Sequence, residues 1–271
     1  MIEWRNLYRG VLMGTSDIIP GVSGGTIAVV LGIYQRLIEG INGLFTREWK
    51  RHLAFLVPLL LGVLLALWSL SGVIEWLFDH YPNQIQFLFM GLIVGIIPML
   101  LKKSDYRARF GVQHYVLFIL AALLVGSMAL FQEGVAETIT SFDNGTTFVL
   151  LFLSGWLASS AMILPGISGS MLLLIVGMYP TFVYVIHNLV IAALIPLGLG
   201  IVFGLLIMSK IIKYFLERYF HQTYALIIGL VFGSLFVIYP GFNQSVLLNV
   251  VSVLLIFTGL YAAYLLGKLE H

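Results

Sequence analysis

The sequence predicts an all-α polytopic membrane protein built as a tandem repeat of inverted topology. Three observations predict this class: an apolar composition, apolar segments long enough to cross a bilayer, and a Pro-Gly phrase that occurs twice. The 271 residues are 60% hydrophobic and 10% charged, with a mean hydropathy of +1.03, whereas about 25% of residues in a soluble domain are charged. The chain has no cysteine, which excludes disulfides, thiolate metal sites and cysteine nucleophiles.

Six segments are predicted to span the membrane, because each approaches the roughly 20 apolar residues that a spanning helix needs. They lie at about 53–72, 84–101, 112–132, 185–209, 222–239 and 246–267. Two further apolar regions, 6–34 and 147–180, are interrupted by the Pro-Gly phrases and are predicted to form broken or re-entrant helical hairpins. The alternative is that residues 147–164 cross fully and 167–184 cross back, which leaves the orientation of the later spans unchanged. No soluble domain is left over, and the longest polar loops are 35–52 and 133–146.

The chain contains an internal repeat. "PGVSGGTIAVVLGIY" (20–34) aligns without a gap with "PGISGSMLLLIVGMY" (165–179), 145 residues later. A second block aligns at a separation of 138 residues, where Pro58 meets Pro196 and Gly91 meets Gly229. The difference falls in the loop 35–52, which is longer in the first half. We therefore predict a first repeat over 1–132, an extracytoplasmic linker over 133–146, and a second repeat over 147–271.

Lys and Arg predict the orientation, because short cytoplasmic loops are enriched in both. If the N-terminus is cytoplasmic and each interrupted region enters and leaves on one side, all 14 basic residues fall in the cytoplasm. The loops left outside, 73–83, 133–146 and 240–245, contain five acidic residues and no Lys or Arg. Each repeat has three full spans, so the second copy is predicted to be upside down, as in many secondary transporters. Both termini are predicted to be cytoplasmic.

The duplicated phrase predicts an anion-binding site. Pro20 and Pro165 are predicted to end one helical segment each, and a second half-helix is predicted to start near Thr26 and Met171. Unpaired N–H groups at such a start, close backbone approach at glycine and nearby hydroxyls suit a phosphate. Two copies entering from opposite faces would bring these ends together near the midplane. The predicted binding residues are Gly21, Ser23, Gly24, Gly25, Thr26, Gly166, Ser168, Gly169 and Ser170. The alternative is a plain kink at which small residues allow tight helix packing.

The motifs "MGTSDIIPGVSGGTIAVVLGIY" and "ASSAMILPGISGSMLLLIVGMY" resemble the bacterial polyprenyl-phosphate transporter family (PopT), which was long catalogued as a membrane domain of unknown function. The resemblance covers nearly the whole chain. It implies a non-enzymatic carrier in the cytoplasmic membrane that returns undecaprenyl phosphate from the outer to the inner leaflet, for reuse in envelope glycan synthesis. Its partner would be the lipid itself, with no nucleic acid and no cofactor.

Two of the ionisable residues before the first phrase, Asp17 and Arg9, are candidates for a role in transport. Asp17 is a functional candidate because an ionisable group inside the membrane is costly, and its repeat mate is the apolar Met162. One hypothesis is coupling to H+ or Na+, in which a proton taken up by Asp17 offsets the charge of the lipid. The alternatives are a helix cap and a salt bridge with Arg9, two helical turns earlier. Arg9 is also predicted to attract the lipid phosphate, although positive-inside anchoring explains it equally well.

The matched pair Tyr34 and Tyr179 ends the two half-helices. These side chains either lie at the membrane interface as aromatic anchors or line the path of the head group.

Other functions remain open at this stage. "GVSGG" satisfies G-x-S-x-G, and both phrases resemble the serine motif of rhomboid intramembrane proteases. A serine nucleophile needs a base within reach, and His187 is the only histidine within a clear apolar run. A carrier or channel for a small soluble anion fits the half-helix argument equally well, and a scaffold subunit is a further alternative. The absence of a Walker loop and of HExxH argues against ATP-driven transport by this chain alone and against that metal motif.

Overall fold

The computed structural model describes residues 2–18, 22–131, 138–142, 144–242 and 245–269. Over these residues the regular secondary structure consists of helices. In chain order they are α1 (Arg5–Asp17), α2 (Gly24–Val30), α3 (Tyr34–Gly43), α4 (Trp49–His80), α5 (Pro82–Lys103), α6 (Tyr106–Arg109), α7 (Val112–Met128), the 3-10 turn η1 (Ala129–Phe131), α8 (Gly145–Ile163), α9 (Gly169–Ile175), α10 (Tyr179–His187), α11 (Ile191–Arg218), α12 (Phe220–Ile238) and α13 (Val246–Leu269).

Seven helices in the described part of the chain are long and apolar enough to cross a membrane. Six of them (α4, α5, α7 with η1, α11, α12 and α13) correspond to the predicted spans, which confirms an all-α multi-pass membrane protein. The seventh is α8, whose 19 residues come from the region predicted as the second broken hairpin. The rest of that region forms α9 and α10, which are bent by 119° to each other.

Two predicted boundaries miss short helices, and the span predicted to end at 72 continues to His80 as α4, through most of the predicted loop 73–83. The span predicted to begin at 185 begins at Ile191, because α10 continues to His187 and Leu189 then adopts a left-handed conformation (φ 49°) that separates the two helices. The predicted loop 35–52 contains most of α3, which buries Leu37 and Ile38 against the core. In both places a short helix lies beside a longer one, and hydropathy alone does not separate them.

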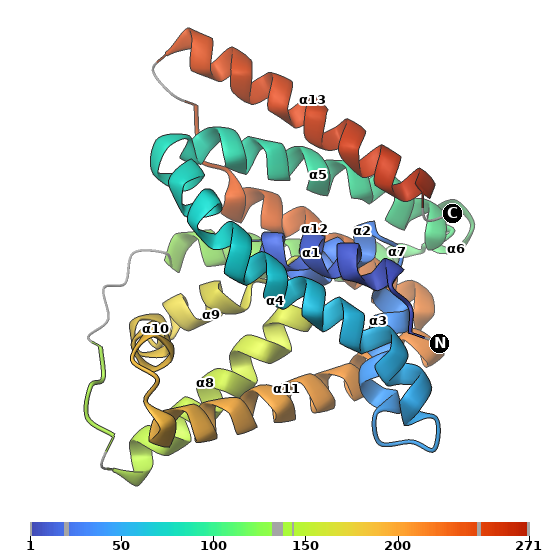
Figure 1. Ribbon diagram of the computed structural model, residues 1–271. Coiled ribbons are helices and arrows are strands. Elements are labelled where there is room, and N and C mark those ends of the chain that lie inside the picture. Colours follow the sequence, from blue (N-terminus) through green and yellow to red (C-terminus); the bar gives the residue numbers. More distant parts are fainter. Residues whose placement is uncertain (1, 19–21, 132–137, 143, 243–244, 270–271) are drawn as a thin grey trace.

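The helices pack in four main pairs: α1 with α4, α8 with α11, α5 with α13, and α7 with α12. Figure 1 shows α5 beside α13 at one side of the molecule and α8 beside α11 at the opposite side. Glycines lie at the crossings. A Cβ added at Gly10 would meet the carbonyl of Leu59, and one added at Gly155 would meet the carbonyl of Leu197. The backbones therefore touch, as is typical of helix packing in membranes.

The other two pairs join the two halves of the chain. Gly91 of α5 packs on Ile256 of α13, and Gly229 of α12 packs on Phe118 of α7. Each pair takes one helix from either predicted repeat, so the halves interlock. Gly229 lies 138 residues after Gly91, and Ile256 lies 138 residues after Phe118. This is the separation found in the sequence. These contacts support the tandem repeat, while its orientation in the membrane stays a prediction.

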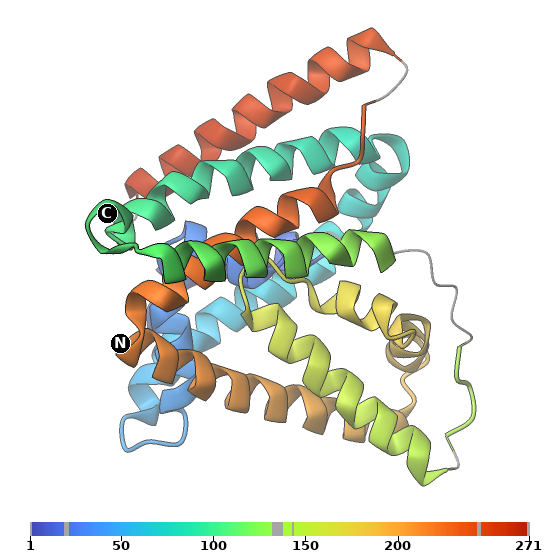
Figure 2. The same cartoon turned by 180° about the vertical axis from the view of Figure 1, so that it is seen from behind.

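The broken segments reach the centre of the molecule from opposite ends. α1 begins beside the N-terminus and α8 begins at the far end, whereas α2 and α9 begin in the interior (Figure 1, Figure 2). All seven residues of α2 are buried, so this short helix forms the middle of the core. α6, the connection between α3 and α4, and the end of α13 lie at the same end as the N-terminus (Figure 1).

Candidate functional site

The two Pro-Gly phrases contact each other in the core. Ser23 Oγ donates a 2.8 Å hydrogen bond to the carbonyl of Met162, and Thr26 Oγ1 accepts a 2.8 Å hydrogen bond from the backbone N–H of Gly166. A Cβ added at Gly25 would lie 2.9 Å from the Met162 carbonyl oxygen, so glycine is needed for this approach. The phrases thus form one site from segments about 140 residues apart in sequence.

The first phrase starts α2 with its own hydrogen-bond acceptors. The helix begins at Gly24, two residues before the predicted Thr26, and Ser23 caps it by accepting a 3.1 Å hydrogen bond from the N–H of Gly25. The N–H of Gly24 donates to Asp17 Oδ1 at 2.6 Å. The donors predicted to be free for phosphate at Gly24 and Gly25 are therefore already paired within the chain. Pro20 and Gly21, also named in the prediction, lie outside the described residues.

In the second phrase the serine hydroxyls do not cap the helix. α8 ends at Ile163, two residues before the predicted end at Pro165. α9 begins at Gly169, two residues before the predicted start near Met171. Ser168 is the N-cap residue of α9 but makes no side-chain capping bond. Its Oγ instead lies 2.8 Å from Ser170 Oγ. The two half-helix starts are thus chemically different, although their sequences match.

Gly166 and Gly169 fix the backbone of the second phrase. Gly166 has φ +86°, and a Cβ there would lie 2.5 Å from the Leu230 carbonyl of α12, so both conformation and space require glycine. A Cβ at Gly169 would lie 2.5 Å from the Ala158 carbonyl oxygen. Both glycines therefore hold the turn tightly against neighbouring helices.

Residues of both phrases line one cavity of about 200 Å³, which we call the motif cavity. Its polar residues are Asp17, Ser23, Ser159, Ser168 and Ser170. The rest of the wall is mainly apolar and comes from α8, α9, α10 and α11. Ser159 was not predicted, because serines scattered along the apolar α8 form no motif. The one sequence signal for it is the run of small residues "ASSA" just before the second phrase.

Asp17 is the acidic residue of the motif cavity. Its Oδ1 accepts from Gly24, while its Oδ2 is buried and has no hydrogen-bond partner among the described residues. Of the two structural alternatives, the interaction with a helix start is therefore observed, and a carboxylate is stabilised at that end of a helix. The carboxylate occupies the position that an anionic ligand of α2 would need.

Arg9 is not brought to the cavity. Arg9 Nη1 donates a 2.7 Å hydrogen bond to Asn6 Oδ1, and its guanidinium carbon lies 5.8 Å from the centroid of the Tyr8 ring. None of the ion pairs found between described residues joins Arg9 to Asp17, and Arg9 does not line the cavity. Of the two alternatives for Asp17, the salt bridge with Arg9 is therefore not observed between the described residues.

The geometry gives no support to a serine hydrolase. No histidine is among the described residues that line the motif cavity. Ser23 Oγ donates to main-chain carbonyls, and Ser168 Oγ pairs with another hydroxyl. A serine nucleophile needs a base at its hydroxyl, and neither serine has one.

The comparison with known proteins agrees with this geometry. A family model described as undecaprenyl phosphate translocase-like matches residues 13–251, a range that includes Asp17 and both phrases. The chain belongs to this translocase-like family. It is 40% identical over 274 residues to a polyprenyl-phosphate transporter of Staphylococcus aureus, which covers 98% of this chain and 97% of the relative. It is 34% identical over 245 residues to a polyprenyl-phosphate transporter of Vibrio cholerae, covering 86% and 76%.

No solved structure matches this protein significantly. The translocase-like family and both relatives carry the names of transporters. Together with the seven apolar helices, they confirm the predicted class: a multi-pass membrane transporter that is not an enzyme.

Proposed function

We propose that this translocase-like protein carries polyprenyl phosphate between the two leaflets, with the phosphate head group in the motif cavity and the prenyl chain in the bilayer. One observation carries the proposal: the two phrases, joined by the Ser23–Met162 and Thr26–Gly166 hydrogen bonds, line one cavity to which they, α1 and α8 bring a carboxyl group and four serine hydroxyls. The names of the two relatives support this substrate.

The size of the motif cavity suits a head group rather than a whole lipid. Its volume of about 200 Å³ is below the roughly 300–1,000 Å³ of sites that enclose drug-sized ligands. Met162 lines the cavity and is 39% exposed on the surface of the protein. An apolar, exposed rim residue allows the prenyl chain to stay outside in lipid while the phosphate enters.

The two phrases are assigned different tasks. Ser168 and Ser170 supply hydroxyls, and the backbone at Gly169 supplies an N–H, to the phosphate at the start of α9. The first phrase, from Ser23 to Thr26, holds the second phrase in place and keeps Asp17 at the start of α2. The Gly24 N–H becomes a donor for the phosphate only after Asp17 withdraws. Phosphate recognition by a backbone turn with hydroxyls is common in proteins.

Asp17 is proposed to couple transport to an ion. An ionised Asp17 and a phosphate repel each other in one cavity, where the low dielectric strengthens the repulsion. Protonation removes the charge of Asp17 and weakens its hold on the Gly24 N–H, so the head group can enter. Na+ bound by the buried carboxylate would remove the same charge and is the second candidate ion.

The fold supports the remaining parts of the proposal. Broken segments that reach the interior from opposite ends (Figure 2) and line one cavity there are typical of carriers with alternating access. In this proposal the basic end and both termini lie in the cytoplasm, and the membrane is the bacterial cytoplasmic membrane. Flux would then return undecaprenyl phosphate from the outer to the inner leaflet for recycling in envelope glycan synthesis.

A liposome assay tests this proposal. The purified protein is reconstituted with undecaprenyl phosphate, neutral undecaprenol or entrapped inorganic phosphate, and transbilayer movement is followed. We expect movement of undecaprenyl phosphate alone, slowed by Ser168→Ala and unchanged by Ser69→Ala, an exposed serine of α4 outside the cavity. Movement of inorganic phosphate without the lipid would replace the proposal by the alternative of a small-anion carrier.

A further inference from the structure

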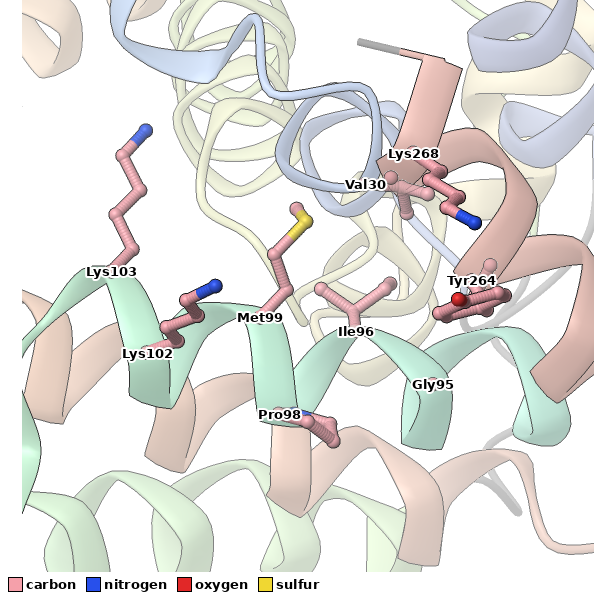
Figure 3. A pocket seen from close by; sticks show the side chains of 11 residues that line it. Val30, Gly95, Ile96, Pro98, Met99, Lys102, Lys103, Tyr264 and Lys268 are labelled. Atoms are coloured by element: carbon pink, nitrogen blue, oxygen red, sulfur yellow. The ribbon is translucent and has the colours of Figure 1, made fainter. Parts of the chain in front are cut away.

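A second hollow lies at the end of the α5–α13 pair, away from the motif cavity. It has a volume of about 760 Å³ and is formed by the last turns of α5 and α13 and the end of α2. We call it the lysine groove and define it by Lys102, Lys103, Lys268, Tyr264 and Val30. Figure 3 shows Lys102, Met99 and Ile96 along α5, with Val30 and Lys268 across the groove from them.

Positive charge converges on this groove. The chain has six lysines, and three of them line the groove from two helices that are about 165 residues apart in sequence. No acidic side chain is among the described residues that line it, and none of the three lysines forms an ion pair with a described residue. Positive-inside anchoring explains the sign of these charges. It does not explain why half of the lysines share one hollow.

Most of the lining of the lysine groove is apolar. Val30, Ile96, Met99 and Ala263 line it together with the three lysines. Gly95 and Gly267 also line the groove and contribute no side chain to fill it. Cationic groups beside an apolar lining suit an amphipathic anion, namely a lipid with a phosphate head group. Basic pockets between helices at the cytoplasmic face commonly bind such head groups.

An unsatisfied polar group lies beside the lysine groove. Lys103 and Met99 also line a separate, narrower space of about 20 Å³ beside the groove, which reaches Tyr34 and Tyr224. Tyr34 is only 5% exposed, and its hydroxyl is buried without a hydrogen-bond partner among the described residues. A buried unpaired hydroxyl is costly, so a ligand oxygen at this place would stabilise it. The sequence left the role of Tyr34 open, and this contact favours the head-group path.

Space for a prenyl chain adjoins the same tyrosine. Tyr34 and Ile227 also line a mainly apolar groove of about 680 Å³ beside α7, α11 and α12. A free phosphate would make no contact with such an apolar wall, whereas the prenyl chain of a lipid can lie along it. α2 connects the two sites, because its start lies at the motif cavity and Val30 at its end lines the lysine groove. Seven helical residues span roughly 10 Å.

We propose that the lysine groove is a second binding site for the phosphate head group of a polyprenyl phosphate, where the lipid arrives after it leaves the motif cavity. This inference rests on the proposed function and adds a second, separate binding site at the basic end of the protein. Lys102, Lys103 and Lys268 neutralise the phosphate, and the Tyr34 hydroxyl donates to it from the narrower space that Lys103 also lines.

Binding in detergent tests this site separately from transport. The intact protein is titrated with farnesyl phosphate, farnesol, inorganic phosphate or phosphatidylglycerol, and bound molecules are counted by native mass spectrometry. The test variant is Lys102→Gln/Lys103→Gln/Lys268→Gln. The matched control, Lys50→Gln/Lys210→Gln/Lys213→Gln, removes the same charge from the three lysines outside the groove. Melting temperatures show whether both variants fold.

We expect the wild type to bind two farnesyl phosphates and the test variant one, with at least about a tenfold loss of affinity at the lost site. Tyr34→Phe, which keeps the ring, should weaken the same site. The control variant should bind two. Equal binding by the test and control variants would overturn the proposal, and so would displacement by inorganic phosphate or by phosphatidylglycerol at equal concentration. If the site binds farnesyl phosphate but liposomes move no lipid, the groove stands and the proposed transport function fails.

Discussion

The carboxylate of Asp17 accepts a 2.6 Å hydrogen bond from the backbone N–H of Gly24, so the end of α1 is tied to the start of α2. The two groups are so close that a Cβ at residue 24 would lie 2.7 Å from Asp17 Oδ2. The protein thus keeps one of its own carboxyl groups at a helix start in the core. A phosphate that uses this helix start has to displace Asp17, which gives the first prediction.

Asp17→Asn is expected to uncouple transport from the proton gradient. Asparagine still accepts from the Gly24 N–H through its oxygen but carries no charge at any pH, so it cannot take up or release the proton. We expect lipid movement in liposomes that no longer changes when a gradient is imposed. Asp79→Asn, at an exposed position near the end of α4, is the matched control and should keep the wild-type response. A variant with unchanged gradient dependence would remove Asp17 from the coupling step.

Gly25→Ala is expected to separate the two phrases. The added Cβ would lie 2.9 Å from the Met162 carbonyl oxygen, and this oxygen belongs to a backbone that cannot move aside freely. We expect a loss of about 1–3 kcal/mol in stability together with loss of transport. Gly198→Ala in α11 is the control, because a Cβ there meets nothing within 4 Å and alanine favours a helix. Melting curves in detergent compare the two. Equal melting temperatures would contradict the observed approach.

Thr26→Val is expected to cost stability through a single hydrogen bond. Valine has nearly the shape of threonine but leaves the buried N–H of Gly166 without the acceptor that it has at 2.8 Å. An unsatisfied buried donor costs about 1–3 kcal/mol. Thr26→Ser keeps the hydroxyl and should retain most of that stability. If the serine variant melts as low as the valine variant, the lost methyl packing, and not the hydrogen bond, carries the effect.

The sequence predicted the class and six of the spans because long apolar runs are intrinsic to each segment. It also located both phrases, since Pro and Gly act locally. The shorter helices α3 and α10 were not predicted. Most of α3 was assigned to the polar loop 35–52, and the end of α10 was assigned to the span predicted to begin at 185. For α8 the sequence left two possibilities open, a re-entrant segment or a full crossing over 147–164, and the helix is long enough for a full crossing.

The chemistry of the site was harder to predict. Two matched phrases suggested two equivalent half-helix starts, yet Asp17 and Ser23 satisfy donors of the first, whereas Ser168 makes no capping bond in the second. This difference depends on the distance between Asp17 and Gly24 in the fold, and sequence spacing does not give it. The lysine groove depends likewise on the pairing of α5 with α13, which brings Lys268 beside Lys102.

The inverted arrangement predicts which residues can be labelled from each side of the membrane. The natural chain has no cysteine, so single cysteines can be introduced without removing others. Thr46→Cys and Ala108→Cys lie in exposed segments near the basic end, and Thr140→Cys and Ser245→Cys lie in exposed segments predicted to be outside. A membrane-impermeant maleimide added to intact cells should label positions 140 and 245. Positions 46 and 108 should react only after permeabilisation.

The same experiment tests the pseudo-symmetry. By the 138-residue separation, the loop around 108 corresponds to the loop around 245, so equivalent loops should react from opposite sides. A parallel repeat would place both loops on one side and give both the same accessibility. That result would also place Lys102 and Lys268 on opposite faces of the membrane, which is incompatible with their shared groove. The labelling pattern and the convergence of the lysines therefore have to agree, because both depend on an odd number of crossings between the repeats.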